Sequence, residues 1–217
     1  MRLKAYLLVF LFWCAVSHQV HAVIYKDVGT GSDVSYLFLQ FTGPSPEQIL
    51  YTYHYDYSAL TPLNGANLLL AVDAFDSLLQ VSYSGSPSAS FFMYELAYNG
   101  YSQPTYEETG NYSWTAFLSG GYQLRYDAFF QPVRDGEGNL VYDPVPSGTW
   151  SFANAGATDR LIAPGSWDAW VFGEYAGDWS SYLEPLPDVT PVPEPENLFL
   201  LGIAGFAGWL WKRKRLS

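Results

Sequence analysis

Alternation of hydrophobic and polar positions runs through residues 23–175 and predicts many short β-strands. The pattern is clearest at residues 36–41 and 49–57, which are rich in aromatic and branched side chains, as strands usually are. A turn sequence, Gly43-Pro44-Ser45-Pro46, separates these two segments. The same pattern predicts further strands at residues 79–83, 90–98, 112–118, 123–130, 149–153, 158–162 and 168–175.

One segment departs from the alternation and predicts a helix between Asn64 and Gln80. Its apolar residues recur at helical spacing, with polar residues on the opposite face. Asn64, or Thr61-Pro62, would start the helix. The apolar positions are Leu68, Leu69, Val72, Phe75 and Leu79. Together these elements predict a mainly β (α+β) fold: a β-sandwich or a twisted antiparallel sheet carrying one amphipathic helix.

Composition and charge divide the chain into three parts. The 217 residues are 18% aromatic but only 14% charged, and six of the ten basic residues lie at the two ends. The middle holds four basic and twenty-one acidic side chains, a formal charge of −17. Nucleic acid is excluded as a partner because its phosphates need cationic side chains.

The amino-terminal residues 1–22 form a secretory signal peptide. Arg2 and Lys4 precede an apolar run of twelve residues, and Val20 and Ala22 provide the small residues of a cleavage site. The alternative is a transmembrane helix, which would need about twenty apolar residues. Cleavage after Ala22 removes Cys14, the only cysteine, so the mature chain has no disulfide and no thiol chemistry.

The carboxy-terminal end combines three features. The motif Val192-Pro193-Glu194-Pro195 is followed by fourteen apolar residues, 198–211, and by the basic cluster Lys212-Arg213-Lys214-Arg215. As a helix the apolar run is about 21 Å long, a short transmembrane segment. The basic cluster would stop it on the cytoplasmic side, which leaves the acidic middle outside. An ordinary tail anchor is the alternative.

This arrangement resembles the PEP-CTERM sorting signal of Gram-negative bacteria, here residues 192–217. The resemblance implies recognition of Pro193, Glu194 and Pro195 by an exosortase, a membrane-embedded processing enzyme. It also implies a transient inner-membrane anchor, and release to the cell surface or the exopolysaccharide matrix. Shorter motifs at residues 29–33, 148–150 and 165–170, together with the predicted helix at 68–79, resemble an uncharacterised group of exported proteins that often carry the same tail.

The chain therefore divides into a signal peptide (1–22), a β-rich extracytoplasmic domain (23–183), a proline-rich linker (184–197), and a transmembrane helix with a basic tail (198–217). The five prolines of the linker favour an extended, semi-rigid spacer. The expected partners are signal peptidase, an exosortase, the inner membrane and exopolysaccharide.

Few residues of the middle point to chemistry. His54 is the one histidine after residue 22 and lies between tyrosines on a predicted strand. The sequence contains no Gly-x-Ser-x-Gly motif whose serine this histidine could activate, so we expect a structural role. Asp135, Glu137 and Asn139 offer oxygen ligands for calcium in a glycine-rich loop, but Pro146 replaces the last ligand of the full motif. We expect a plain hairpin tip, which explains the same residues, rather than a calcium site.

Tryptophans offer the remaining candidate surface. Trp114, Trp167 and Trp170 could stack on sugar rings, whereas core packing is the expected role of Trp150 and Trp167. We therefore predict a non-catalytic surface or matrix protein without a cofactor. The alternatives are a carbohydrate- or small-ligand-binding module with exposed tryptophans and, third, a glycoside hydrolase, which needs two facing carboxylates.

Overall fold

A computed structural model describes residues 23–41, 47–58, 63–104, 112–174, 187 and 189–191. The prediction of a mainly β fold with one helix is confirmed for these residues, which hold helix α2 (Gly65–Phe75) and a single 3-10 turn, η1 (Ala157–Asp159). The strands are β1 (Val23–Gly29), β2 (Asp33–Gln40), β3 (Gln48–Tyr55), β4 (Leu79–Ser86), β5 (Ser90–Tyr98), β6 (Tyr101–Pro104), β7 (Tyr112–Ser119), β8 (Tyr122–Leu124), β9 (Tyr142–Pro144), β10 (Ser151–Phe152), β11 (Arg160–Leu161) and β12 (Trp167–Glu174).

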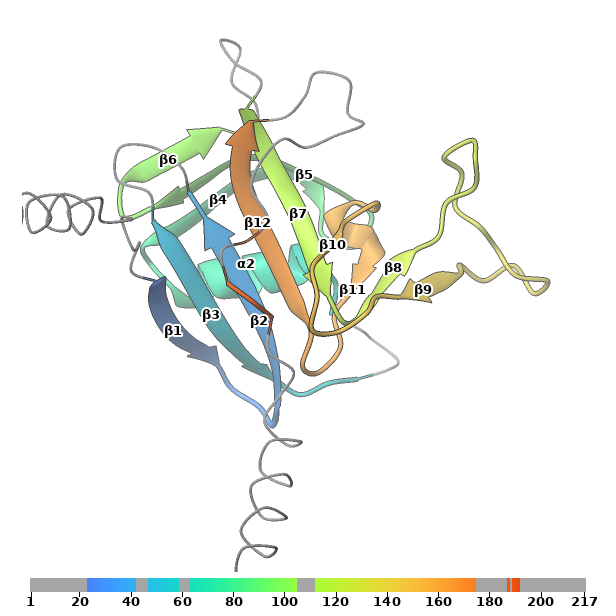
Figure 1. Ribbon diagram of the computed structural model, residues 1–217, viewed down its shortest axis with the longest axis horizontal. Coiled ribbons are helices and arrows are strands. Elements are labelled where there is room, and N and C mark those ends of the chain that lie inside the picture. The colour runs from blue at the N-terminus through green and yellow to red at the C-terminus, as the bar shows by residue number, and fades with distance from the viewer. Residues whose placement is uncertain are drawn as a thin grey trace, which may run out of the picture.

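A six-stranded sheet in the order β1-β3-β2-β12-β7-β10 forms the centre of the domain (Figure 1). The pairs β1–β3 and β2–β12 are parallel, and the other pairs are antiparallel. The central sheet is therefore mixed, whereas one of the two predicted alternatives is a twisted antiparallel sheet; the two smaller sheets are antiparallel. Alternation along one strand does not reveal this, because direction depends on which distant strand becomes the neighbour.

The first face of the central sheet is covered by helix α2 and by the small antiparallel sheet β4-β5-β6, which Figure 1 shows behind it. Leu68, Leu69 and Val72 of the helix are fully buried against this face. Burial of each such side chain contributes about 1.5–3 kcal/mol. The sheet side of this core is supplied by Leu37, Leu39, Ile49, Tyr51, Trp114, Trp170 and Phe172.

The second face carries a smaller apolar cluster centred on Phe38, Phe117 and Trp167. Trp150 and Val189 pack against this cluster, and Pro187 and Pro191 are buried. The short red-orange segment of Figure 1 is this part of the predicted linker. Part of the predicted linker thus packs against the central sheet.

Helix α2 is shorter than its hydrophobic pattern predicts. Asn64 caps its start as expected, because its side-chain oxygen accepts a hydrogen bond from the amide of Asn67 at 2.8 Å. Asp76 has extended backbone angles and ends the helix, and β4 begins at Leu79. Leu79 stays buried although it belongs to a strand, so its apolar character alone could not place it in the helix.

Three predicted strands are also shorter in the structure. The strand expected at residues 149–153 is only β10, Ser151–Phe152. Strand β8 ends at Leu124, and residues 125–142 form a protruding arm joined by isolated bridges at Tyr126 and Arg134. The predicted strand 158–162 begins as the turn η1 and pairs only at Arg160 and Leu161.

The connection between β1 and β2 has to cross the end of β3, which lies between them. Only Thr30, Gly31 and Ser32 link the two strands. Adjacent strands in a sheet are about 4.8 Å apart, so these three residues have to cover two such spacings. Gly31 has φ +146°, and an added Cβ would lie 2.1 Å from the carbonyl carbon of Tyr55. Glycine is required here by direct backbone contact as well as by conformation.

We expect Gly31→Ala to lower the free energy of unfolding by at least about 2 kcal/mol, because the backbone of β3 cannot move aside. Urea unfolding monitored by tryptophan fluorescence measures this. Gly100→Ala is the matched control: Gly100 has φ +81° but nothing within 4 Å of an added Cβ. Its cost should be about 1 kcal/mol, from conformation alone. If both variants lost the same free energy of unfolding, contact with the β3 backbone could not be the reason that glycine is required at position 31.

Candidate functional site

The candidate ligand-stacking tryptophans are buried. Trp114, Trp167 and Trp170 are only 8%, 6% and 8% exposed, so none of them offers a ring face to a sugar. The prediction of an exposed tryptophan surface is wrong for these residues, because β7 and β12 lie in the middle of the sheet with both faces covered. The core role predicted for Trp167 is confirmed.

The tryptophans instead make contacts between different strands and segments of the domain. Trp167 stacks on Tyr36 at a centroid distance of 4.4 Å, and Trp170 lies 4.9 Å from the guanidinium of Arg160. Trp150 is half-buried, and its Nε1 donates a hydrogen bond to the carbonyl of Val189 at 2.7 Å. This bond ties the chain near the predicted sorting motif to the second face of the sheet.

The candidate calcium loop is an exposed hairpin tip. One carboxylate oxygen of Asp135 accepts hydrogen bonds from the amides of Glu137 and Asn139, both at 2.9 Å. The other accepts from the side-chain amide of Asn139 at 3.2 Å. These bonds lower the pKa of Asp135, and they explain the residue types of the loop by turn chemistry.

His54 makes a surface pair with Asp27. The distance between Nε2 and the carboxylate oxygen is 2.6 Å, and Asp27 is largely exposed. The pair joins the parallel neighbours β1 and β3 near their ends. It carries the structural role that the sequence predicts for this histidine.

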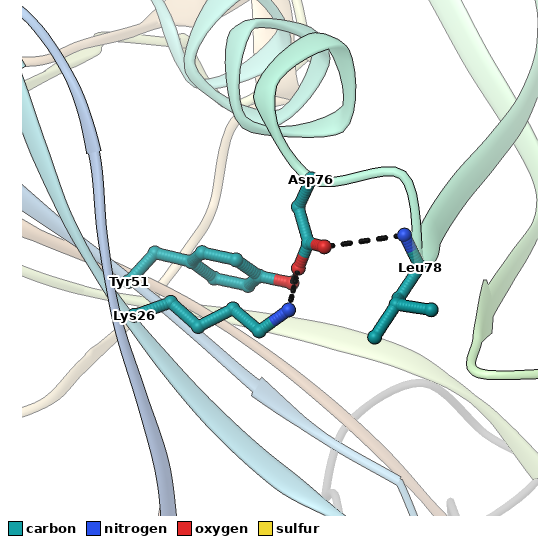
Figure 2. A network of polar contacts seen from close by, with 4 residues as sticks. All are labelled: Lys26, Tyr51, Asp76 and Leu78. Carbon is teal, nitrogen blue, oxygen red and sulfur yellow. Dashed lines mark hydrogen bonds and ion pairs between the residues drawn. The ribbon is translucent and has the colours of Figure 1, made fainter.

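A polar network that sequence analysis missed lies at the carboxy-terminal end of α2 (Figure 2). One carboxylate oxygen of Asp76 accepts hydrogen bonds from the Lys26 ammonium at 2.5 Å and from the Tyr51 hydroxyl at 2.8 Å. The other oxygen accepts from the amide of Leu78 at 3.1 Å. Tyr51 is fully buried and Asp76 nearly so. The network links β1, β3 and the turn into β4.

Electrostatics fix the charge states of this network. Burial tends to raise the pKa of Asp76, but the hydrogen bonds from Lys26, Tyr51 and Leu78 outweigh it and lower that pKa. Burial tends to lower the pKa of Lys26, but its bond to Asp76 and the nearby Tyr98 raise it. Burial and the neighbouring carboxylate raise the pKa of Tyr51. The ammonium, carboxylate and phenol are thus held in states unsuited to proton transfer near neutral pH.

A second buried pair lies at the other end of the helix. Asp168 accepts two hydrogen bonds from Nη2 of Arg160, at 3.0 and 2.7 Å, and both side chains are almost completely buried. Complete burial raises the pKa of Asp168, and Arg160 opposes that change. An added Cβ on Gly65 would lie 2.6 Å from the Asp168 carboxylate, so the first turn of α2 rests directly on the pair.

The structure leaves the predicted sorting features untested. Val20 and Ala22, the motif Val192-Pro193-Glu194-Pro195 and the cluster Lys212-Arg213-Lys214-Arg215 all lie outside the described residues. Within the described ranges, no helix is long and apolar enough to cross a membrane. The same ranges contain no group of three or more histidine, cysteine or acidic side chains placed to hold a metal ion.

Comparisons of the chain with family models, curated proteins and solved structures found no match.

We expect Asp76→Asn to lower the free energy of unfolding by about 2 kcal/mol at pH 7, because it leaves the Lys26 ammonium half-buried without its counter-charge. Asp76 has a lowered pKa in the folded state, so its contribution is present above the ordinary value of 3.8 and is lost as pH falls through the folded value. Lys26 has a raised pKa, so its contribution is present below 10.5 and is lost as pH rises through the folded value.

The difference between wild type and Asp76→Asn should therefore be constant from about pH 5 to 9 and shrink on both sides. Urea titrations at a series of pH values measure it. Asp143→Asn, which breaks the exposed pair with Arg125, is the control and should lower the free energy of unfolding much less, because solvent screens an exposed ion pair. A difference that grows in acid would contradict this account of the network.

Proposed function

We propose that this chain is an exported, non-catalytic cell-surface or matrix protein that an exosortase sorts through residues 192–217. The observation that carries the proposal is the order of three parts: a signal peptide, an acidic β-rich domain, and a tail of Pro-Glu-Pro motif, short apolar segment and basic cluster. In this proposal residues 198–211 form a short transmembrane helix in the precursor, and the domain lies outside.

The position of the first strand supports export. Strand β1 begins at Val23, the residue after the proposed cleavage site, and Val23 itself packs on the second face of the sheet. In this proposal the mature chain begins with a residue that is ordered in the central sheet.

The polar contacts of the domain support a non-catalytic role. The networks at Asp76 and Asp168 join secondary-structure elements, and the charge states at Asp76 suit anchoring rather than proton transfer. We propose exopolysaccharide as a partner only on the ground of the matrix location. The buried tryptophans do not supply the surface for a dedicated sugar site.

The tail gives the direct test of sorting. Replacing Pro193, Glu194 and Pro195 with alanine in the host should trap the full-length precursor in the inner membrane, because the exosortase would no longer recognise it. Fractionation and immunoblotting measure the distribution. Glu196→Ala with Asn197→Ala, just beyond the motif, is the matched control and should be released normally. Normal surface release of the triple variant would overturn the exosortase proposal.

The amino terminus gives a separate test of export. The mature protein should begin at Val23, as read by amino-terminal sequencing of surface material. Ala22→Arg should abolish this cleavage, because signal peptidase needs a small residue at that position. His21→Arg, one residue earlier, serves as the control and should still yield Val23. A mature chain that retains Cys14 would contradict the assignment.

A further inference from the structure

The arm, residues 125–142, carries the two most exposed large apolar side chains of the described domain. Phe129 is 81% exposed and Phe130 is 84% exposed, at the first of its two hairpin tips. Figure 1 shows the arm in yellow, projecting from the body beyond β8 and β9. Adjacent apolar residues displayed in this way usually mark an interaction site.

The tip is held in one conformation. A carboxylate oxygen of Asp127 accepts hydrogen bonds from the amides of Phe129 at 2.8 Å and Gln131 at 2.9 Å. Phe130 has φ +58°, a left-handed conformation that is unfavourable for a side chain of this size. The tip therefore keeps both rings in solvent against a local conformational cost, which is typical of a preorganised contact.

The arm is also braced at its base. Arg125 forms an ion pair with Asp143, and its Nε donates to that carboxylate at 2.9 Å. The Tyr126 hydroxyl donates to Asp159 of the body at 2.8 Å. A contact made by the tip would thus be transmitted to the whole domain.

The arm holds the one cation of the described residues that has no ion-pair partner. Lys26, Arg125 and Arg160 are each paired with a carboxylate. Arg134 is exposed, and its guanidinium donates only to the carbonyl of Gly138, at 2.7 Å. Two exposed phenylalanines and a guanidinium without an ion-pair partner, all on one arm, suit a surface that combines exposed aromatic rings with a carboxylate.

The same chain carries such a surface on the outer side of β5. Phe92 and Tyr94 are 59% and 49% exposed, with ring centroids 5.4 Å apart. They point away from the core because Met93 and Leu96 face inward, and Tyr94 is the extra residue of a β-bulge. Glu95 lies beside them and faces Ser82 of β4. We call Phe92, Tyr94 and Glu95 the β5 patch.

We propose that the arm of one copy docks on the β5 patch of a second copy. The Phe129 and Phe130 rings would pack on Phe92 and Tyr94, and Arg134 would pair with Glu95. A second copy is the partner we commit to, because its β5 patch offers exposed rings and the Glu95 carboxylate to the exposed rings and the unpaired cation of the arm. Two different surfaces meet in this contact, so association is head-to-tail and can continue into open chains. It does not depend on the sorting proposal.

Site-directed disulfide cross-linking of the full chain in mild detergent tests the contact. Cys14→Ser removes the only natural cysteine. One tagged chain then carries Ala128→Cys at the arm tip, and a differently tagged chain carries Ser82→Cys beside the patch. Mixing and oxidation should give the mixed dimer. Thr30→Cys, exposed on the distant β1–β2 connection, replaces Ser82→Cys in the matched control and should give a background yield.

Adding Phe129→Ser and Phe130→Gly to the arm chain should lower the mixed-dimer yield about tenfold, because both rings of the contact are lost. Glycine suits the positive φ at position 130, so this variant keeps the fold. Arg134→Glu should lower the yield as well, by about fivefold. Equal yields at Ser82→Cys and Thr30→Cys, or a yield that survives loss of the rings, would overturn the proposal. So would a dominant product between two Ala128→Cys arms.

Discussion

The packing of helix α2 against the central sheet is the interaction on which the rest of the domain depends. The described residues contain no cysteine, so cross-links cannot hold the two layers together, and apolar burial between them has to do so. The helix is only eleven residues long and would be marginal alone. Its buried stripe joins β4 and β5 to the six-stranded sheet in a single core.

The two ends of α2 show why buried charges are retained in this core. At the start, Arg160 and Asp168 lie beneath the first turn, and Asn64 caps it. At the end, Asp76 would be disfavoured by the helix dipole, and Lys26 from β1 compensates. Apolar contacts alone would allow the helix to slide along the sheet. Two polar anchors, one at each end, set its position and direction.

Strands and helix caps that follow from local patterns could be predicted from the sequence. Contacts between residues far apart in the chain could not. The span of β5 and the cap at Asn64 follow from alternation and turn chemistry. The parallel pairs of the central sheet do not, because β12 and β2 are more than a hundred residues apart in the chain. The Asp76 network could not be predicted for the same reason: Lys26, Tyr51 and Asp76 come from three elements, and no spacing connects them. The rarity of lysine in the domain was the one available signal.

The unusual aromatic content follows from the same physical constraint. A domain without disulfides needs large side chains, and Trp114, Trp167 and Trp170 fill both faces of the sheet. The indole Nε1 groups of Trp167 and Trp170 are buried without a hydrogen-bond partner among the described residues, which is unfavourable. The apolar area of these rings, and the Arg160 guanidinium over Trp170, offset that cost. Aromatic residues consumed in this way cannot also bind ligands. Among the aromatic residues left in solvent, Phe129 and Phe130 of the arm are the most exposed, and the one described cation without an ion-pair partner, Arg134, belongs to the same arm.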